Sequence, residues 1–79
     1  MSSKTIPEQH QKRLEIISIY LRELRLSEGL TQKNLSQTVN LHRNSIIRAE
    51  NGKNLTILSL FELADALNIS PKDIFMLIE

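Results

Sequence analysis

Residues 30–53 read LTQKNLSQTVNLHRNSIIRAENGK, and this stretch decides the fold. Its apolar residues are spaced as in two short helices, over about 32–38 and 42–50, and Thr31 is a good N-cap for the first of them. Asn40 stands between the two helices, where one continuous helix would need a helix former. Because asparagine tolerates the left-handed conformation better than most residues, Asn40 predicts a left-handed turn at this point.

Three further helices are expected, one before this pair and two after it. The first covers about residues 7–28, and Gly29 is placed to end it in the left-handed conformation. The fourth begins after Thr56 and ends at Asn68, and the fifth begins after Ser70. The apolar stripes are Leu14, Ile17, Leu21 and Leu24 in the first helix and Leu60, Leu63, Ala64 and Leu67 in the fourth.

These patterns predict an all-α fold, a compact bundle of five short helices over residues 7–79, after a flexible N-terminus at residues 1–6. The chain has 79 residues, enough for one domain of modest stability. It has no cysteine, which excludes disulfides and thiolate metal sites. It also has no apolar run long enough to cross a membrane and no signal-peptide pattern, so a cytoplasmic location is expected.

Charge is distributed unevenly, although the net charge is only +1. Residues 31–54 contain four lysines and arginines and a single glutamate, whereas residues 55–79 contain four acidic residues and a single lysine. A basic middle region favours a polyanionic partner, and an ordinary solvated surface is the alternative.

The helix expected over about 42–50 places four residues on one arc of its surface. With Arg43 at 0° and about 100° per residue, Ile47, Asn44 and Arg48 fall at about 40°, 100° and 140°. Arginine pairs with guanine, asparagine pairs with adenine, and an apolar side chain contacts the thymine methyl group. The arc therefore suits the major groove of DNA, and the two helices with their short turn predict a helix-turn-helix over about 31–50.

The segment LRELRLSEGLTQKNLSQTVNLHRNSIIRAENGK, followed by LSLFELADALNISPKDIF, resembles the lambda-repressor/Cro-like helix-turn-helix family, also called the XRE family. The resemblance covers about residues 17–76, and its most specific parts are GLTQ, the spacing to ENGK, and ALNISPKDIF. It implies a sequence-specific DNA-binding transcriptional regulator, with repression as the first expectation, that binds double-stranded DNA and needs no cofactor. Shorter likenesses, NLHR and KNLTI, are similar to the controller proteins of restriction–modification systems, a branch of this family.

The resemblance implies DNA contacts at two sets of positions. The base-reading positions fall on His42, Arg43, Asn44, Ile47 and Arg48. The phosphate-contacting positions fall on Thr31, Gln32, Asn51 and Lys53, and the two-helix geometry adds Lys33 beside Gln32. The resemblance also implies a structural ion pair between Arg25 and Glu50. His42 stands where the family often has serine or threonine, and we expect it to be a poorer helix cap.

Functions of other classes find less support in the sequence. There is no glycine-rich phosphate loop and no nucleophile with a plausible base, so no enzyme is expected. His10 and His42 are far apart and no carboxylate cluster joins them, so no metal site is expected. No small-molecule ligand is evident from the sequence. The rival interpretation is an antitoxin or a protein-binding adaptor of the same fold. A pure protein-binding adaptor would have no need for Arg43 and Asn44 on this face.

Apolar residues near the C-terminus predict a homodimer. The fifth helix is expected to carry Ile74, Phe75, Leu77 and Ile78 around most of its circumference, more than one domain covers. Ile19 is also expected to be exposed. The fifth helix and part of the fourth would meet their copies and set two recognition helices about 34 Å apart on an inverted-repeat operator. The alternative is that the fifth helix only closes the bundle, and the sequence leaves the operator and the regulated genes open.

Overall fold

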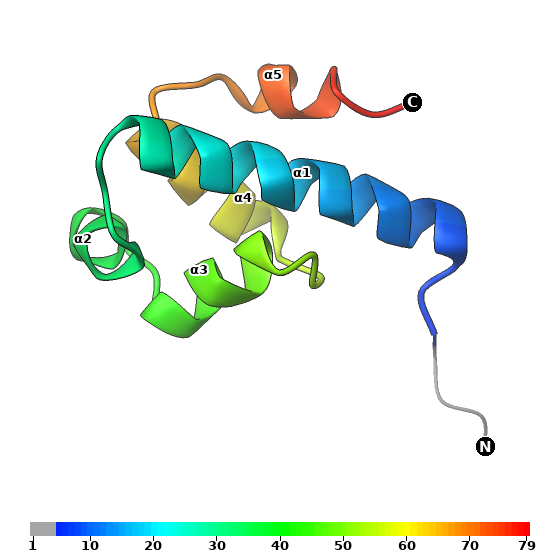
Figure 1. Ribbon diagram of the computed structural model, residues 1–79, viewed down its shortest axis with the longest axis horizontal. Helices are drawn as coiled ribbons and strands as arrows, with labels where there is room; N and C mark the ends of the chain where they lie inside the picture. Colours follow the sequence, from blue (N-terminus) through cyan, green and yellow to red (C-terminus); the bar gives the residue numbers. More distant parts are fainter. Residues whose placement is uncertain (1–4) are drawn as a thin grey trace.

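The computed structural model describes residues 5–79, which form five α-helices and no strand (Figure 1). The helices are α1 (Glu8–Ser27), α2 (Gln32–Thr38), α3 (Arg43–Glu50), α4 (Ile57–Ala66) and α5 (Pro71–Phe75). The predicted all-α fold of five helices is confirmed. Of the N-terminus predicted to be flexible, residues 1–4 lie outside the described part, and Thr5 and Ile6 precede α1 without regular structure.

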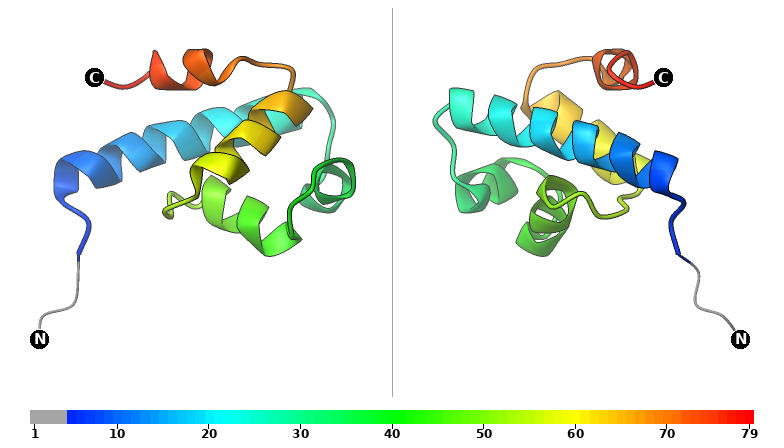
Figure 2. Two further views of the ribbon diagram at one scale, coloured as in Figure 1. Left: turned by 180° about the vertical axis from the view of Figure 1, so that it is seen from behind. Right: turned by 45° about the vertical axis from the view of Figure 1, so that its right-hand side comes forward.

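Helix α1 runs through the length of the molecule and separates the other elements. In Figure 1, α2 and α3 lie below α1 and α5 lies above it, and the two turned views keep this order (Figure 2). Helix α3 packs against both α1 and α2, and α4 packs against α5. The helix-turn-helix pair therefore occupies one side of the domain, and the C-terminal helix occupies the other.

Every helix contributes a large, fully buried side chain to one core. These are Leu21 from α1, Leu35 from α2, Ile46 from α3, Leu63 from α4 and Ile74 from α5. Burying one such side chain stabilises the fold by about 1.5–3 kcal/mol. The apolar stripe predicted for α4 is buried in full, and that of α1 is buried in its middle and half-buried at its two ends.

Short polar side chains start α2, α4 and α5, as predicted. The hydroxyl groups of Thr31, Thr56 and Ser70 accept hydrogen bonds from backbone N–H groups of the first turn at 2.9, 3.0 and 3.3 Å. A cap of this kind contributes about 1 kcal/mol, so each start is fixed by its own sequence.

Left-handed residues end α1, α3 and α4. Gly29, Gly52 and Asn68 have φ angles of 71°, 73° and 59°. The residue after each of them donates its N–H to the carbonyl oxygen five residues earlier, at 3.1, 3.1 and 3.0 Å. This is the Schellman arrangement, which satisfies carbonyl groups left open at the helix end.

Asn40 lies in the turn between α2 and α3, but the prediction that it is left-handed is wrong. Asn68 is the one non-glycine residue with positive φ in residues 5–79. The backbone N–H of Asn40 instead donates to the Oε1 atom of Glu62 in α4, at 3.2 Å. A contact from another helix thus helps to hold this turn.

The last helix is shorter than predicted. It ends at Phe75, and the next bonds, from Leu77 N–H to Ile74 O at 3.2 Å and from Ile78 N–H to Phe75 O at 3.4 Å, have the tighter three-residue spacing. Leu77 and Ile78 therefore follow α5 and do not belong to it. Ile78 is half-buried and packs against the core, while Leu77 is exposed.

Candidate nucleic-acid interface

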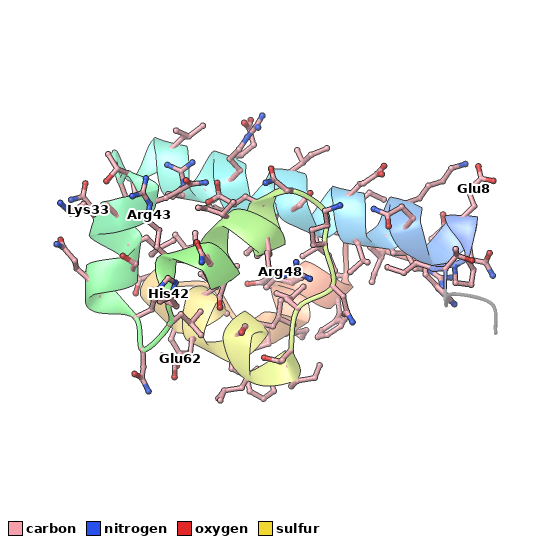
Figure 3. All side chains as sticks on the ribbon, turned by 90° about the horizontal axis from the view of Figure 1, so that it is seen from below. Glu8, Lys33, His42, Arg43, Arg48 and Glu62 are labelled. Atoms are coloured by element: carbon pink, nitrogen blue, oxygen red, sulfur yellow. The ribbon has the colours of Figure 1, made fainter. Side chains whose placement is uncertain are left out.

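Helix α3 presents a polar face to solvent and anchors its opposite face in the core. Ile46 and Ala49 have exposed fractions of 0% and 1%. Arg43, Asn44 and Arg48 are exposed, and Ile47 between them is half-buried. Figure 3 shows the molecule from the side on which α2 and α3 lie in front, with Arg43 and Arg48 along α3. The predicted arc of reading residues is thus brought together on a helix that cannot rotate without exposing its core face.

His42 is the N-cap of α3. Its backbone is extended, and its ring Nδ1 accepts a hydrogen bond from the backbone N–H of Asn44 at 3.0 Å. The residue that the sequence marked as a poorer cap does close the helix start, with a ring nitrogen in place of the usual hydroxyl oxygen. Its ring is therefore restrained at the edge of the exposed face.

The start of α2 lies beside the start of α3. A surface hollow of about 500 Å³ is lined by the segment from Gly29 to Lys33 and by Arg43. Thr31 caps α2, and Lys33 is exposed. The structure thus brings the predicted phosphate-contacting residues of α2 next to the first predicted base-reading residue of α3.

Arg25 and Glu50 form a buried, bidentate ion pair between α1 and the end of α3. Arg25 Nε and Nη2 donate to Glu50 Oε2 and Oε1 at 2.6 and 2.9 Å, and their side chains are 9% and 4% exposed. Arg25 Nη1 also donates to the Leu30 carbonyl at 2.7 Å, and Gln32 Nε2 donates to Glu50 Oε1 at 3.1 Å. The hydrogen bond with Glu50 raises the pKa of Arg25, against the opposing effect of burial. One cluster therefore fixes α1, α2 and α3 relative to one another.

The loop after α3 is bound to the first half of α1. Gln11 Nε2 donates to the carbonyl oxygen of Gly52 at 3.0 Å. A Cβ atom at Gly52 would lie 3.2 Å from Cγ of Glu15, so the loop approaches α1 closely and glycine suits its φ of 73°. Asn51 and Lys53, on either side of Gly52, are exposed.

Within residues 5–79, the exposed basic side chains around α3 form no ion pair, although the carboxylate of Glu62 lies on the same face (Figure 3). The ion pairs in residues 5–79 are Lys12–Glu8 and Arg25–Glu50. Glu50, the one acid of residues 31–54, is thus already neutralised by Arg25. Four exposed cations, Lys33, Arg43, Arg48 and Lys53, surround α3 without a carboxylate partner in the described part. A surface of this kind attracts a polyanion.

The sequence did not single out the neighbours of Arg48. A second hollow, of about 380 Å³, is lined by Arg48, Ser45, Asn54 and the start of α4. Ser45 lies outside the arc of the helical wheel, and Asn54 lies beyond the loop motif, so only the fold shows that both adjoin Arg48. The polar run from Asn51 to Asn54 was the one available signal.

Apolar side chains are exposed on α4 and around the C-terminus. Phe75 and Leu77 are 46% and 42% exposed, as the predicted dimer interface requires. Ile74 is 0% exposed, so its prediction as an interface residue is wrong, because it fills the core of its own domain. Phe61, expected from the sequence in the core or at an interface, is exposed on α4. Exposed apolar residues that the prediction did not name are Ile57, Leu58 and Met76, and Ile19 on α1 is exposed as expected.

Within residues 5–79, no group of three or more histidine, cysteine or acidic residues is placed to hold a metal ion. No helix in the described part combines the length and the apolar character that a membrane span needs.

Comparison with known families and structures gives a consistent result. The family model described as helix-turn-helix matches residues 21–74. The restriction–modification controller protein C.AhdI from Aeromonas hydrophila is 35% identical in sequence. The match covers 78% of this chain and 96% of that chain, with a TM-score of 0.72. No curated protein matches the sequence.

Solved structures of a second restriction–modification controller protein, C.Esp1396I, are also similar to this chain. The wild-type protein is 35% identical, with 81% of this chain and 86% of that chain covered and a TM-score of 0.70. The tetramer in complex with its natural 35 base-pair operator is 34% identical, with the same coverage and a TM-score of 0.71.

Proposed function

This chain belongs to the helix-turn-helix family of DNA-binding transcription regulators, and we propose that it controls transcription by reading an operator with α3. The observation that carries the proposal is the exposed arc of Arg43, Asn44 and Arg48 on a helix whose other face is buried. The resemblance to the XRE type is confirmed by the family match. Family and fold are those of DNA-binding regulators and not of enzymes.

The reading residues have distinct roles in this proposal. Arg43 donates bidentately to a guanine, and Asn44 pairs with an adenine. Half-buried Ile47 contacts a thymine methyl group with the part of its side chain that stays exposed. Arg48, one turn further along and beside a second hollow, binds either a base edge or a phosphate.

Phosphate contacts would flank α3 at both ends. Lys33 lies beside the hollow at the start of α3, and Lys53 follows its end. Gln32 Nε2 donates one hydrogen bond to Glu50, which leaves its second amide hydrogen to donate to a phosphate oxygen. The Thr31 hydroxyl oxygen accepts from α2, and its own hydrogen is free to donate. Such contacts fix the position of α3 over the bases and carry no sequence information themselves.

We propose that the active species is a two-fold homodimer. Helices α4 and α5 pack together, and apolar side chains that remain exposed on and after them include Phe61, Phe75 and Leu77. Two copies that meet there would each keep α3 free, because α5 and α3 lie on opposite sides of α1 (Figure 1). A dimer reads two half-sites about one DNA turn apart, which makes an inverted repeat the expected operator.

A narrower role is favoured by the solved structures. Both similar proteins are restriction–modification controllers, and C.AhdI is matched over 96% of its chain. We propose that this chain also controls a restriction–modification system. The operator selected in the experiment below should then lie upstream of restriction or methyltransferase genes in the source genome. Sites that occur only beside unrelated genes would favour a general repressor.

The test is selection of bound sequences from a random DNA library, followed by affinity measurements on the selected duplex by fluorescence anisotropy. We expect one enriched inverted repeat, bound at least about 10³-fold more tightly than random DNA. Equal affinity for selected and random duplexes would contradict sequence-specific reading. No binding to any duplex would favour the protein-binding adaptor.

A further inference from the structure

His42 makes a side-chain hydrogen bond that determines where its ring proton lies. The donor in this bond is the backbone N–H of Asn44, 3.0 Å from Nδ1. A nitrogen that accepts a hydrogen bond carries no proton, so the proton of the neutral ring is on Nε2. The cap therefore selects one of the two tautomers of His42.

The same bond is incompatible with a charged ring. A protonated imidazole has a hydrogen on both nitrogens and cannot accept from the Asn44 N–H. It would also place positive charge against the positive end of α3. The capped form of His42 is thus neutral, in contrast to the exposed lysine of α2 and the exposed arginines of α3.

The cap bond engages only one of the two ring nitrogens. Nδ1 and Nε2 lie on separate edges of the ring, so the bond at Nδ1 leaves the Nε2–H able to donate elsewhere. His42 is exposed and immediately precedes the reading residues Arg43 and Asn44. In Figure 3, its side chain lies on the same side of the molecule as Arg43 and Arg48.

Resting on the proposed function, we infer that His42 is a neutral hydrogen-bond donor of fixed orientation in the DNA interface. Its Nδ1 holds the start of α3, and its Nε2–H donates to an acceptor on DNA, a phosphate oxygen or the N7 or O6 atom of a purine. A serine cap in this position would hold the helix but would not extend to the DNA. His42 therefore couples the position of the recognition helix to a contact with the ligand.

The test compares two substitutions that separate the two nitrogens. His42→Ser keeps a good N-cap and removes Nε2, whereas His42→Ala removes both functions. We expect His42→Ser to weaken binding to the selected duplex by about 2- to 10-fold per half-site, the effect of one hydrogen bond. Its thermal midpoint should stay near that of the wild type, and that of His42→Ala should be about 4–8 °C lower.

Salt dependence distinguishes a neutral donor from a cation. Because the ring is neutral, His42→Ser should leave the slope of log K against log salt unchanged, whereas Lys33→Ala should lower its magnitude by about 0.9 per half-site. A slope lowered by about 0.9 in His42→Ser would show that His42 binds as a cation and would overturn the inference. Equal affinity of wild type and His42→Ser would overturn it as well.

The DNA partner atom follows from the same measurements. If His42→Ser loses the same factor of affinity on selected and random duplexes, the acceptor is a phosphate oxygen. If it loses affinity only on the selected duplex, the acceptor is a purine atom. If the wild type binds no DNA, the proposed function fails together with the inference; if it binds and His42→Ser binds equally well, only the inference fails. ¹⁵N NMR of the free protein should show the proton on Nε2, and a proton on Nδ1 would refute the tautomer without any DNA.

Discussion

Replacing Glu50 by glutamine tests the ion pair that joins α1 to α3. The substitution keeps the size and shape of the side chain and removes its negative charge. Arg25 would keep its positive charge in a site where its side chain is only 9% exposed. A glutamine amide accepts hydrogen bonds at one oxygen only, so at most one of the two Arg25 contacts at 2.6 and 2.9 Å would remain, without its charge assistance. Gln32 would compete with Arg25 for that single oxygen.

The expected cost is large for a domain of this size. Removing one member of a buried pair typically costs about 3–5 kcal/mol. At about 0.05–0.15 kcal/mol per residue, the whole domain is stable by about 4–12 kcal/mol. Glu50→Gln should therefore remove at least a quarter of the free energy of unfolding. It should lower the thermal midpoint by about 12 °C or more.

The assay is thermal unfolding followed by circular dichroism, with Glu8→Gln as the matched control. Glu8 pairs with Lys12 at 3.6 Å, and their side chains are 84% and 69% exposed, so its loss should cost at most about 1 kcal/mol. The pKa of Arg25 is raised, so its contribution is complete below its ordinary pKa and is lost only as the solution becomes strongly alkaline. The difference should thus persist from neutral to mildly alkaline pH. Equal midpoints for the two variants would refute the assignment of Glu50 as a structural anchor.

Three further predictions concern DNA and assembly. Arg43→Ala should weaken binding to the selected duplex by about 1–3 kcal/mol per half-site and relax the preference at one base pair; unchanged anisotropy curves on selected and random DNA would contradict this. Lys53→Ala should weaken binding to all duplexes alike and lower the magnitude of the slope of log K against log salt by about 0.9 per half-site. The control Lys72→Ala, on α5, should change neither the affinity nor the slope. Equal slopes for Lys53→Ala and the wild type would exclude a phosphate contact at Lys53. Leu77→Arg should give a monomer in sedimentation equilibrium, whereas Ile19→Arg on α1 should leave the dimer intact; the reverse result would move the interface to α1.

The features that could be predicted from the sequence are those fixed by neighbouring residues. The caps at Thr31, Thr56 and Ser70 each depend on a hydrogen bond across two or three residues, so the residue types reveal them. The left-handed ends at Gly29 and Asn68 depend on one residue and its backbone. The buried stripe of α4 follows from helical spacing in the same way. For these elements, local chemistry and tertiary structure agree.

The features that could not be predicted depend on contacts between distant residues. The N–H of Asn40 donates a hydrogen bond to Glu62, 22 positions away, and the sequence of the turn does not identify that partner. Ile74 was assigned to the surface because its neighbours are apolar, but only the packed bundle shows that its side chain fills the core. The exposed polar face of α3 was predictable from the helical wheel, whereas only the fold shows that Ser45 and Asn54 lie beside Arg48.

The hydrogen bond between Gln11 and the Gly52 carbonyl bears on where this domain begins. The family match begins at residue 21, and Gln11 and Glu15 both lie before it. Gln11 nevertheless binds the loop that follows α3, with a hydrogen bond of 3.0 Å, and Glu15 lies close to Gly52 in that loop. A fragment trimmed to the matched residues would keep α3 and lose this support of the loop that follows it. We therefore expect a fragment that includes the first turns of α1 to be more stable than one that begins at residue 21.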